Sequence, residues 1–219
     1  MISNSYYLKK CLFDIYRVDS KVLYPVLDTE YTLNKKTPPL TPPLRGEGDK
    51  EKVIFAYGRW VKWKNLEQVF QTYNFIKSQV PWLKLNIWWE GIELESFKQR
   101  YKNDTSVSFL WLLDKLSIID NLQKSLVCLF PSKIDSFWMT IIESLSIWVP
   151  VVAFDINWVS EIIKTWQNWF LVKSPDEFNK RVLEILTDDA LYNKLSNNAL
   201  DIVNSFSWKN FEKQLQDIF

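Results

Sequence analysis

The sequence predicts an α/β fold, a Rossmann-like parallel sheet with helices on both faces and further helices at the C-terminus. From residue 53 onward, short apolar runs alternate with segments whose apolar residues follow helical spacing. Strand and helix alternating six times favours a parallel sheet with right-handed crossovers, whose ligands lie beyond the carboxyl ends of the strands. The six apolar runs are Val53 to Tyr57, Leu83 to Ile87, Val107 to Leu110, Leu126 to Phe130, Val149 to Phe154 and Phe170 to Val172.

The clearest helical stripe follows the first of these runs. Leu66, Val69, Phe70, Tyr73 and Ile76 recur at the spacing of one helix face, so this helix is expected to pack against the sheet. The tail from residue 175 to 219 is expected to be helical throughout. Its expected packing positions are Leu183, Leu186, Leu191, Leu195, Val203, Phe211 and Leu215.

Charge and composition exclude several classes of function. The 219 residues carry 27 basic and 26 acidic side chains, a net charge of +1, so no basic surface argues for a nucleic-acid partner. The chain has no histidine, which excludes a Ser-His or Cys-His nucleophile and any His-ligated metal. Its two cysteines, Cys11 and Cys128, lack metal-ligand spacing, and Cys128 is expected to be a buried thiol.

No segment of the chain is typical of a membrane span or a signal peptide. A spanning helix needs about 18 or more apolar residues in a row, and no run approaches that length. Met1 is followed by polar residues rather than by the apolar core of a signal peptide. The expected location is therefore the cytoplasm, without an integral membrane segment.

Two acidic residues flank a turn in the stretch from Phe130 to Asp155. Asp135 follows an apolar run, and Glu143 lies eight residues later in a segment with helical spacing. This pattern resembles the C-terminal donor-binding half of GT-B glycosyltransferases, in particular the retaining family 4. That family has two Glu at this spacing, with glycine-rich turns after each. Here the first acid is Asp, one methylene shorter, and Trp138 and Trp148 occupy family glycine positions.

A basic motif follows the first predicted strand. The sequence Gly58-Arg59-Trp60-Val61-Lys62-Trp63-Lys64 resembles the family segment whose Arg and second Lys hold the donor diphosphate. The resemblance assigns that role to Arg59 and Lys64. Two cations at this place would offset the charge that develops on the leaving diphosphate. A polar loop with no ligand is the alternative interpretation.

The resemblance implies roles for the remaining candidate residues. Asp135 would bind hydroxyls of the donor sugar and Glu143 the hydroxyls of its ribose. The backbone at Phe137, Trp138 and Met139 would cradle phosphate oxygens at a helix start, and Gly58 and Gly91 would shape the loops around the nucleotide. No Asp-x-Asp pair is present, so no metal and no cofactor are expected besides the nucleotide-diphosphate sugar, UDP- or GDP-linked.

The chain divides into three expected parts. Residues 1–34 resemble the crossover from an acceptor-binding domain, residues 35–50 are a Pro-rich linker, and residues 51–219 form the donor-binding domain. Because only about two residues precede the crossover, the chain is expected to be a C-terminal half, truncated or split from its acceptor domain. The linker repeats Thr-Pro-Pro-Leu, so it is an exposed spacer, with a PxxP ligand as the alternative.

The balance of tryptophan and glycine is unusual. The chain has 12 Trp and 4 Gly, whereas average usage of about 7% would give about 15 glycines. We hypothesise that most of these Trp are glycine in the native protein, as happens when a UGA codon read as glycine is translated as tryptophan. The positions concerned are Trp63, Trp111, Trp138, Trp148, Trp158, Trp166, Trp169 and one of Trp88 and Trp89. Trp208 matches a family Trp and is taken as genuine.

The expected function is a retaining, family 4-like glycosyltransferase of polysaccharide biosynthesis. The chain would bind the nucleotide-sugar donor. A glycan or lipid-linked acceptor would bind through an absent N-terminal domain. Where the acceptor is a lipid, the full enzyme would associate peripherally with the membrane. The alternative is a truncated, non-catalytic donor-binding remnant. A third interpretation takes the Trp residues as a stacking surface for carbohydrate or bases.

Overall fold

The computed structural model describes residues 1–28, 31, 52–59, 62–90, 94–111, 113–134, 139–156, 159 and 169–218. For residues 52, 59, 89–90 and 200–204 it describes only the backbone. The Pro-rich segment 35–50 and the candidate glycine positions Trp138, Trp158 and Trp166 lie outside these ranges.

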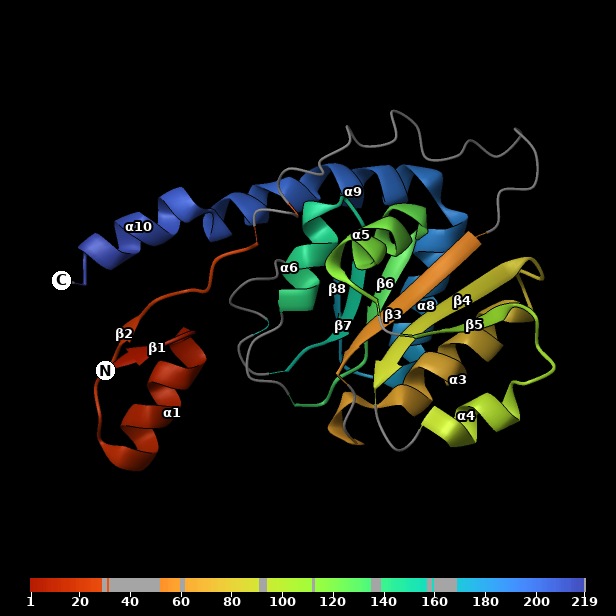
Figure 1. Ribbon diagram of the computed structural model, residues 1–219, viewed down its shortest axis with the longest axis horizontal. Helices are drawn as coiled ribbons and strands as arrows, with labels where there is room; N and C mark the ends of the chain where they lie inside the picture. The colour runs from red at the N-terminus through yellow and green to blue at the C-terminus, as the bar shows by residue number, and fades with distance from the viewer. Residues whose placement is uncertain are drawn as a thin grey trace.

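Six parallel strands form the main sheet, as the sequence predicts (Figure 1). Their order is β5-β4-β3-β6-β7-β8, so the chain moves outward from β3 to β5 and then returns to place β6 beside β3. This return makes a switch point between β3 and β6, where α/β sheets bind their ligands. The strands are β3 (Lys52–Arg59), β4 (Leu83–Glu90), β5 (Val107–Leu110), β6 (Val127–Phe130), β7 (Val151–Phe154) and β8 (Phe170–Val172).

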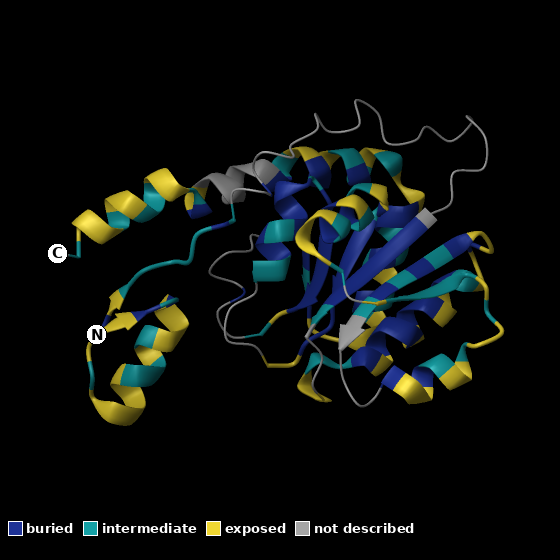
Figure 2. Cartoon of the chain, viewed as in Figure 1, coloured by how far each residue is buried: buried dark blue, intermediate teal, exposed yellow. Residues whose placement is uncertain are grey.

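Helices cover both faces of this sheet and bury its central strands, whereas β5 at one edge is only half-buried (Figure 2). One buried cluster joins the sheet to α3 (Leu66–Lys77), α4 (Leu94–Arg100) and α8 (Pro175–Thr187). The other joins it to α5 (Lys115–Lys124) and α6 (Met139–Ser146), and α9 (Asp189–Val203) contributes to both clusters. The predicted fold class is confirmed.

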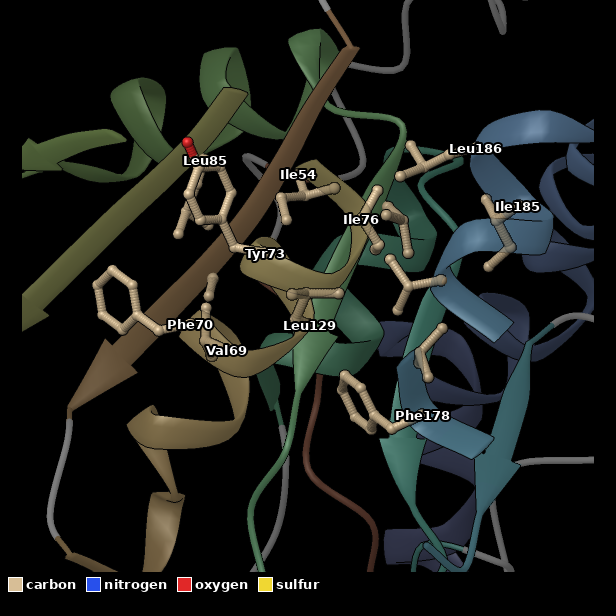
Figure 3. Packing of buried hydrophobic residues seen from close by; sticks show 14 of the residues in the cluster. Ile54, Val69, Phe70, Tyr73, Ile76, Leu85, Leu129, Phe178, Ile185 and Leu186 are labelled. Atoms are coloured by element: carbon tan, nitrogen blue, oxygen red, sulfur yellow. The ribbon is translucent and has the colours of Figure 1, made fainter. Parts of the chain in front are cut away.

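The stripe predicted for the first helix is the buried face of α3 (Figure 3). Phe70 and Tyr73 are each 1% exposed, and Ile76 is fully buried. The Phe70 ring stacks on Phe97 of α4 with 4.4 Å between centroids. An apolar stripe with the helical period therefore fixes which face of α3 meets the sheet.

Asp104 ties the loop before β5 to α3. Its Oδ2 accepts a hydrogen bond from the Tyr73 hydroxyl at 2.6 Å, and its Oδ1 accepts one from the Ser106 N–H at 2.9 Å. Burial alone would raise the pKa of Asp104, but these hydrogen bonds outweigh it and lower the pKa below the ordinary value.

We expect Asp104→Asn to lower the free energy of unfolding at pH 7 by about 1 kcal/mol, since the carboxylate is partly exposed to solvent. A carboxyl with a lowered folded pKa stabilises the fold above its unfolded pKa and loses that contribution as pH falls through the folded value. Urea unfolding at pH 7 and pH 3 should therefore show a smaller difference between parent and variant in acid. An equal difference at both pH values would contradict this role.

The first residues form a small unit outside the main sheet. Strands β1 (Ile2–Ser3) and β2 (Lys21–Val22) pair in parallel around helix α1 (Tyr6–Tyr16), which has no buried residue. The unit contacts the last helix, α10 (Trp208–Gln216), through the Tyr24 N–H, which donates to Gln214 Oε1. Beyond β2 the chain reaches the main domain, where Leu27 and Tyr31 are buried in the α5–α6 cluster.

The tail is helical, as the sequence predicts, with short breaks at residues 188 and 207. It consists of α8, α9, the 3-10 turn η2 (Asn204–Phe206) and α10. Asp188 Oδ1 accepts from the Leu191 N–H and Ser207 Oγ from the Asn210 N–H, so side-chain caps begin the new helices. Leu215 is 36% exposed because α10 extends away from the sheet toward the N-terminal unit (Figure 1).

Trp148 occupies a backbone position that suits glycine. It follows α6 with φ +64°, its N–H donates to the Leu145 carbonyl at 2.9 Å, and the next N–H, of Val149, donates to the Ser144 carbonyl at 3.1 Å. These two bonds make a Schellman motif, whose left-handed residue is usually glycine. The indole N–H groups of Trp88, Trp148 and Trp169 are buried and have no hydrogen-bond partner among the described residues.

Cys128 is fully buried in β6 and forms no disulfide. Burial raises the pKa of its thiol to about 12, so the thiol stays protonated at neutral pH. Within the described ranges, no helix is both long enough and apolar enough to cross a membrane. The same part of the chain contains no group of three His, Cys, Asp or Glu residues that could hold a metal ion.

Candidate functional site

The candidate site lies at the switch point, where the carboxyl ends of β3 and β6 are neighbours. Gly58 and Arg59 end β3, and the chain then forms the 3-10 turn η1 (Lys62–Lys64) before α3. The Lys133 N–H, three residues after β6, donates to the Trp63 carbonyl at 2.9 Å. The basic motif and the beginning of the acidic motif, far apart in sequence, are thus hydrogen-bonded to each other.

The backbone conformation explains why position 58 is a glycine. Its φ of +138° lies in a region that residues with a Cβ rarely adopt, although a Cβ added there would meet no atom within 4 Å. Glycine is therefore required for conformation rather than for space. Arg59 pairs with Glu90 in the register of β3 and β4, at the carboxyl edge of the sheet. Lys64, at the end of η1, is half-buried.

Glu143 is held at this edge by a residue of β3. Its Oε2 lies 3.0 Å from the Tyr57 hydroxyl, which also lies 3.0 Å from the Thr140 carbonyl oxygen. Both Glu143 and Thr140 belong to α6, so Tyr57 fixes this helix against the strand before Gly58. A rigid neighbour of this kind reduces the freedom that the carboxylate would lose on binding a ligand.

The surroundings of Glu143 are partly apolar. Burial raises the pKa of its carboxyl, while hydrogen bonds from Tyr57 and Tyr31 and the positive charge of Lys115 act in the opposite direction. Lys115 itself forms an ion pair with Asp28. These contacts bring the segment after β2, the start of α5 and the middle of α6 to one place beside β3.

We expect the pH dependence of ligand binding to report the ionisation of Glu143. The pKa of Glu143 is raised in the folded protein, so its carboxylate becomes protonated as the pH falls through that raised value. The protonated carboxyl is a weaker acceptor of ligand hydroxyls, so ligand affinity should fall. Tyr57→Phe removes a hydrogen bond that favours the charged form, so the midpoint should move to higher pH. Titrating UDP affinity against pH for parent and Tyr57→Phe measures this, and an unchanged midpoint would contradict it. Tyr192→Phe, a change of the same type on α9, is the control.

The other predicted site residues are placed only in part. Met139 begins α6 and is half-buried. Asp135, Phe137, Trp138 and Gly91 lie outside the described residues. Their expected roles stay predictions.

Sequence reasoning missed Tyr57, Tyr31 and the Lys115–Asp28 pair. Tyr57 shares the face of β3 with buried Phe55, and its ring stacks on it with 4.9 Å between centroids, so its apolar pattern looked like core. Its position directly before the Gly58-Arg59 motif was the available signal. No local signal marks Tyr31, which follows a polar stretch and reaches Glu143 only in the folded chain.

Comparison with known families identifies the class of protein. Residues 43–201 match the family model described as glycosyl transferases group 1. The match covers most of the chain, so the chain belongs to the glycosyl transferases group 1 family.

Two curated relatives carry transferase names. The chain is 20% identical over 187 residues to the poly(glycerol-phosphate) alpha-glucosyltransferase of Bacillus subtilis (strain 168), covering 84% of this chain and 27% of that protein. It is 26% identical over 180 residues to an uncharacterized glycosyltransferase of Methanocaldococcus jannaschii, covering 80% and 46%. The chain therefore spans less than half the length of each.

Solved structures agree on the fold. A mutant of Staphylococcus aureus TarM, in complex with fondaparinux, alpha-GlcNAc-glycerol and UDP, superposes with a TM-score of 0.81 at 15% identity, over 99% of this chain and 43% of TarM. WaaG, a glycosyltransferase of lipopolysaccharide biosynthesis, gives 0.79 at 12% identity, over 99% and 61%. The main sheet with its helices is one half of a GT-B fold.

Proposed function

We propose that this chain is the donor-binding half of a retaining, family 4-like glycosyltransferase that uses a nucleotide-diphosphate sugar. The observation that carries the proposal is the position of Glu143, a half-buried carboxylate fixed by Tyr57 at the switch point of the sheet. A carboxylate can accept hydrogen bonds from two adjacent hydroxyls, the arrangement that a ribose presents. The TarM complex, which contains UDP, supports a nucleotide donor.

In the proposed mechanism the protein positions the reactants and stabilises charge. Glu143 would hold the ribose and Asp135 the donor sugar, and Arg59 and Lys64 would neutralise the diphosphate. Backbone N–H groups from Phe137 to Met139, at the start of α6, would bind phosphate oxygens. The bond between the sugar and the diphosphate breaks as an acceptor hydroxyl attacks from the same face and passes its proton to the leaving phosphate. No protein nucleophile is required.

The acceptor half is proposed to come from a domain outside this sequence. A pair of two-residue strands does not form a stable sheet alone, and α1 buries none of its residues. A domain that extends this unit would cover it. We propose hexosyl transfer to a glycan or lipid-linked acceptor in the cytoplasm, with peripheral membrane association where the acceptor is a lipid. The name of the Bacillus relative, a poly(glycerol-phosphate) alpha-glucosyltransferase, supports the hexosyl transfer.

A transfer assay separates catalysis from simple binding. The chain alone and the chain mixed with an N-terminal half from the Bacillus relative would be given UDP-glucose and poly(glycerol phosphate). Transfer only in the mixture supports a donor half that needs a partner. Transfer by the chain alone would overturn the alternative of a non-catalytic remnant. Binding of UDP without transfer in either sample would favour that alternative.

We also propose that glycine replaces tryptophan at most of the positions named above. The Schellman motif at Trp148 and the unpartnered indoles of Trp88, Trp148 and Trp169 support this. Peptide mass spectrometry of the protein from its native source, covering residues 130–173, tests it. Glycine at 138, 148, 158, 166 and 169 is the expected result, and tryptophan there would overturn the proposal. Binding and transfer assays should use the form that is found.

A further inference from the structure

A second pocket lies at the same edge of the sheet but on the other face from Glu143. It has a volume of about 510 Å³ and lies between the start of α3, the ends of β7 and β8, and the segment after β6. Glu143 belongs to α6 and bonds Tyr57 of the α5–α6 cluster, whereas this pocket is bounded by α3 and the start of α8. The sheet therefore lies between the two sites.

The pocket presents unpaired cations. Lys133 and Lys173 both line it and are exposed, and within the described part of the chain neither ammonium group has an ion pair or hydrogen bond. Asp155 is the one carboxylate among the described lining residues, so the described part of the lining carries a net positive charge. Two lysines that line one pocket suit a dianion better than a single negative charge.

The pocket also presents acceptors that need hydroxyl donors. Gln68 is 2% exposed, and its Nε2 donates to Thr72 Oγ1 at 3.2 Å and to Asn179 Oδ1 at 3.1 Å. These bonds orient the amide, and its carbonyl oxygen, like the Asp155 carboxylate, can only accept hydrogen bonds. Asn65, in the left-handed conformation before α3, does not cap the helix with its side chain. The ring of Phe154 provides an apolar wall.

We propose that this pocket binds a sugar phosphate or polyol phosphate, a phosphate monoester that also carries hydroxyl groups. The phosphate lies between Lys133 and Lys173, and the hydroxyls donate to Gln68 and Asp155. Inorganic phosphate satisfies only the lysines, and a neutral sugar satisfies only the acceptors. The pocket therefore selects molecules that combine both features.

Nuclear magnetic resonance titration of the ¹⁵N-labelled chain tests this with glucose 6-phosphate, inorganic phosphate and glucose as probes. Glucose 6-phosphate should shift the amides of the pocket and bind about tenfold more tightly than either other probe. The double variant Lys133→Ala/Lys173→Ala should weaken it about tenfold or more, and the charge-matched control Lys102→Ala/Lys180→Ala should not. Equal affinity for inorganic phosphate would reduce the site to a general anion site and overturn the proposal.

The donor site provides an independent check. Glu143→Ala should leave glucose 6-phosphate affinity within about twofold of the parent, and Lys133→Ala/Lys173→Ala should leave UDP affinity within the same range. If UDP fails to bind the parent while glucose 6-phosphate binds at the pocket, the donor proposal fails and the pocket stands. If about 10 mM glucose 6-phosphate shifts no amide at the pocket, the pocket proposal is overturned and the donor proposal is unaffected.

Discussion

Glu143→Ala is expected to weaken UDP binding by about 10- to 100-fold, the effect of losing hydrogen bonds to a charged acceptor. The carboxylate accepts from Tyr57 in the free protein, and its half-buried position makes competition from water weak. The fold should survive, because the Tyr57 hydroxyl keeps the Thr140 carbonyl as an acceptor 3.0 Å away. Calorimetric titration with UDP measures the change.

The matched control is Glu212→Ala, which removes an exposed carboxylate from α10. It should leave UDP affinity unchanged. If Glu143→Ala and Glu212→Ala bind UDP equally well, Glu143 is a structural partner of Tyr57 and not a ligand of the ribose. Circular dichroism of both variants shows whether a lost affinity reflects a lost fold.

Trp148→Gly is expected to stabilise the chain, by about 1 kcal/mol or about 2–4 °C in melting temperature. A residue with a Cβ in the left-handed region costs about 1–2 kcal/mol, and a buried N–H without a partner costs about 1–3 kcal/mol. The apolar contacts of the half-buried indole stabilise the fold and offset part of these two costs. The backbone cannot relax away from φ +64°, because the Trp148 N–H and carbonyl are both bonded, the carbonyl to Ser196 Oγ at 2.6 Å.

Trp148→Ala isolates the backbone effect, since it removes the indole but keeps the Cβ. The glycine variant should be more stable than the alanine variant by about 1 kcal/mol. Trp208→Gly is the opposite case, because Trp208 begins α10, packs against Phe211 and has no strained backbone. It should destabilise the chain. Thermal melts in which Trp148→Ala equals or exceeds Trp148→Gly would contradict the assignment of this position to glycine.

The main sheet could be predicted because each strand has its own local signal. All six apolar runs became strands, since a strand buried on both faces by helices needs nearly continuous apolar residues. The ends were less accurate. Strands β3 and β4 continue two and three residues beyond the predicted runs toward the carboxyl edge. Strand β7 begins at Val151, two residues later than predicted, because the Schellman motif and Pro150 delay it.

The site could be predicted in outline, and its contacts could not. The spacing of the basic and acidic motifs indicated one edge of the sheet, and the bond from Lys133 to Trp63 joins them there. That Tyr57 would bond Glu143, 86 residues away, depends on the tilt of α6 against β3, which no local pattern encodes. The second pocket was missed for the same reason, since its residues come from four separate segments.

A crystal structure of the chain with UDP would test whether Glu143 binds the ribose of the donor. We expect the ribose hydroxyls within hydrogen-bond distance of the Glu143 carboxylate, with the diphosphate beside η1 and the start of α6. UDP bound elsewhere, for example with its diphosphate between Lys133 and Lys173 in the second pocket, would contradict the assignment of the donor site.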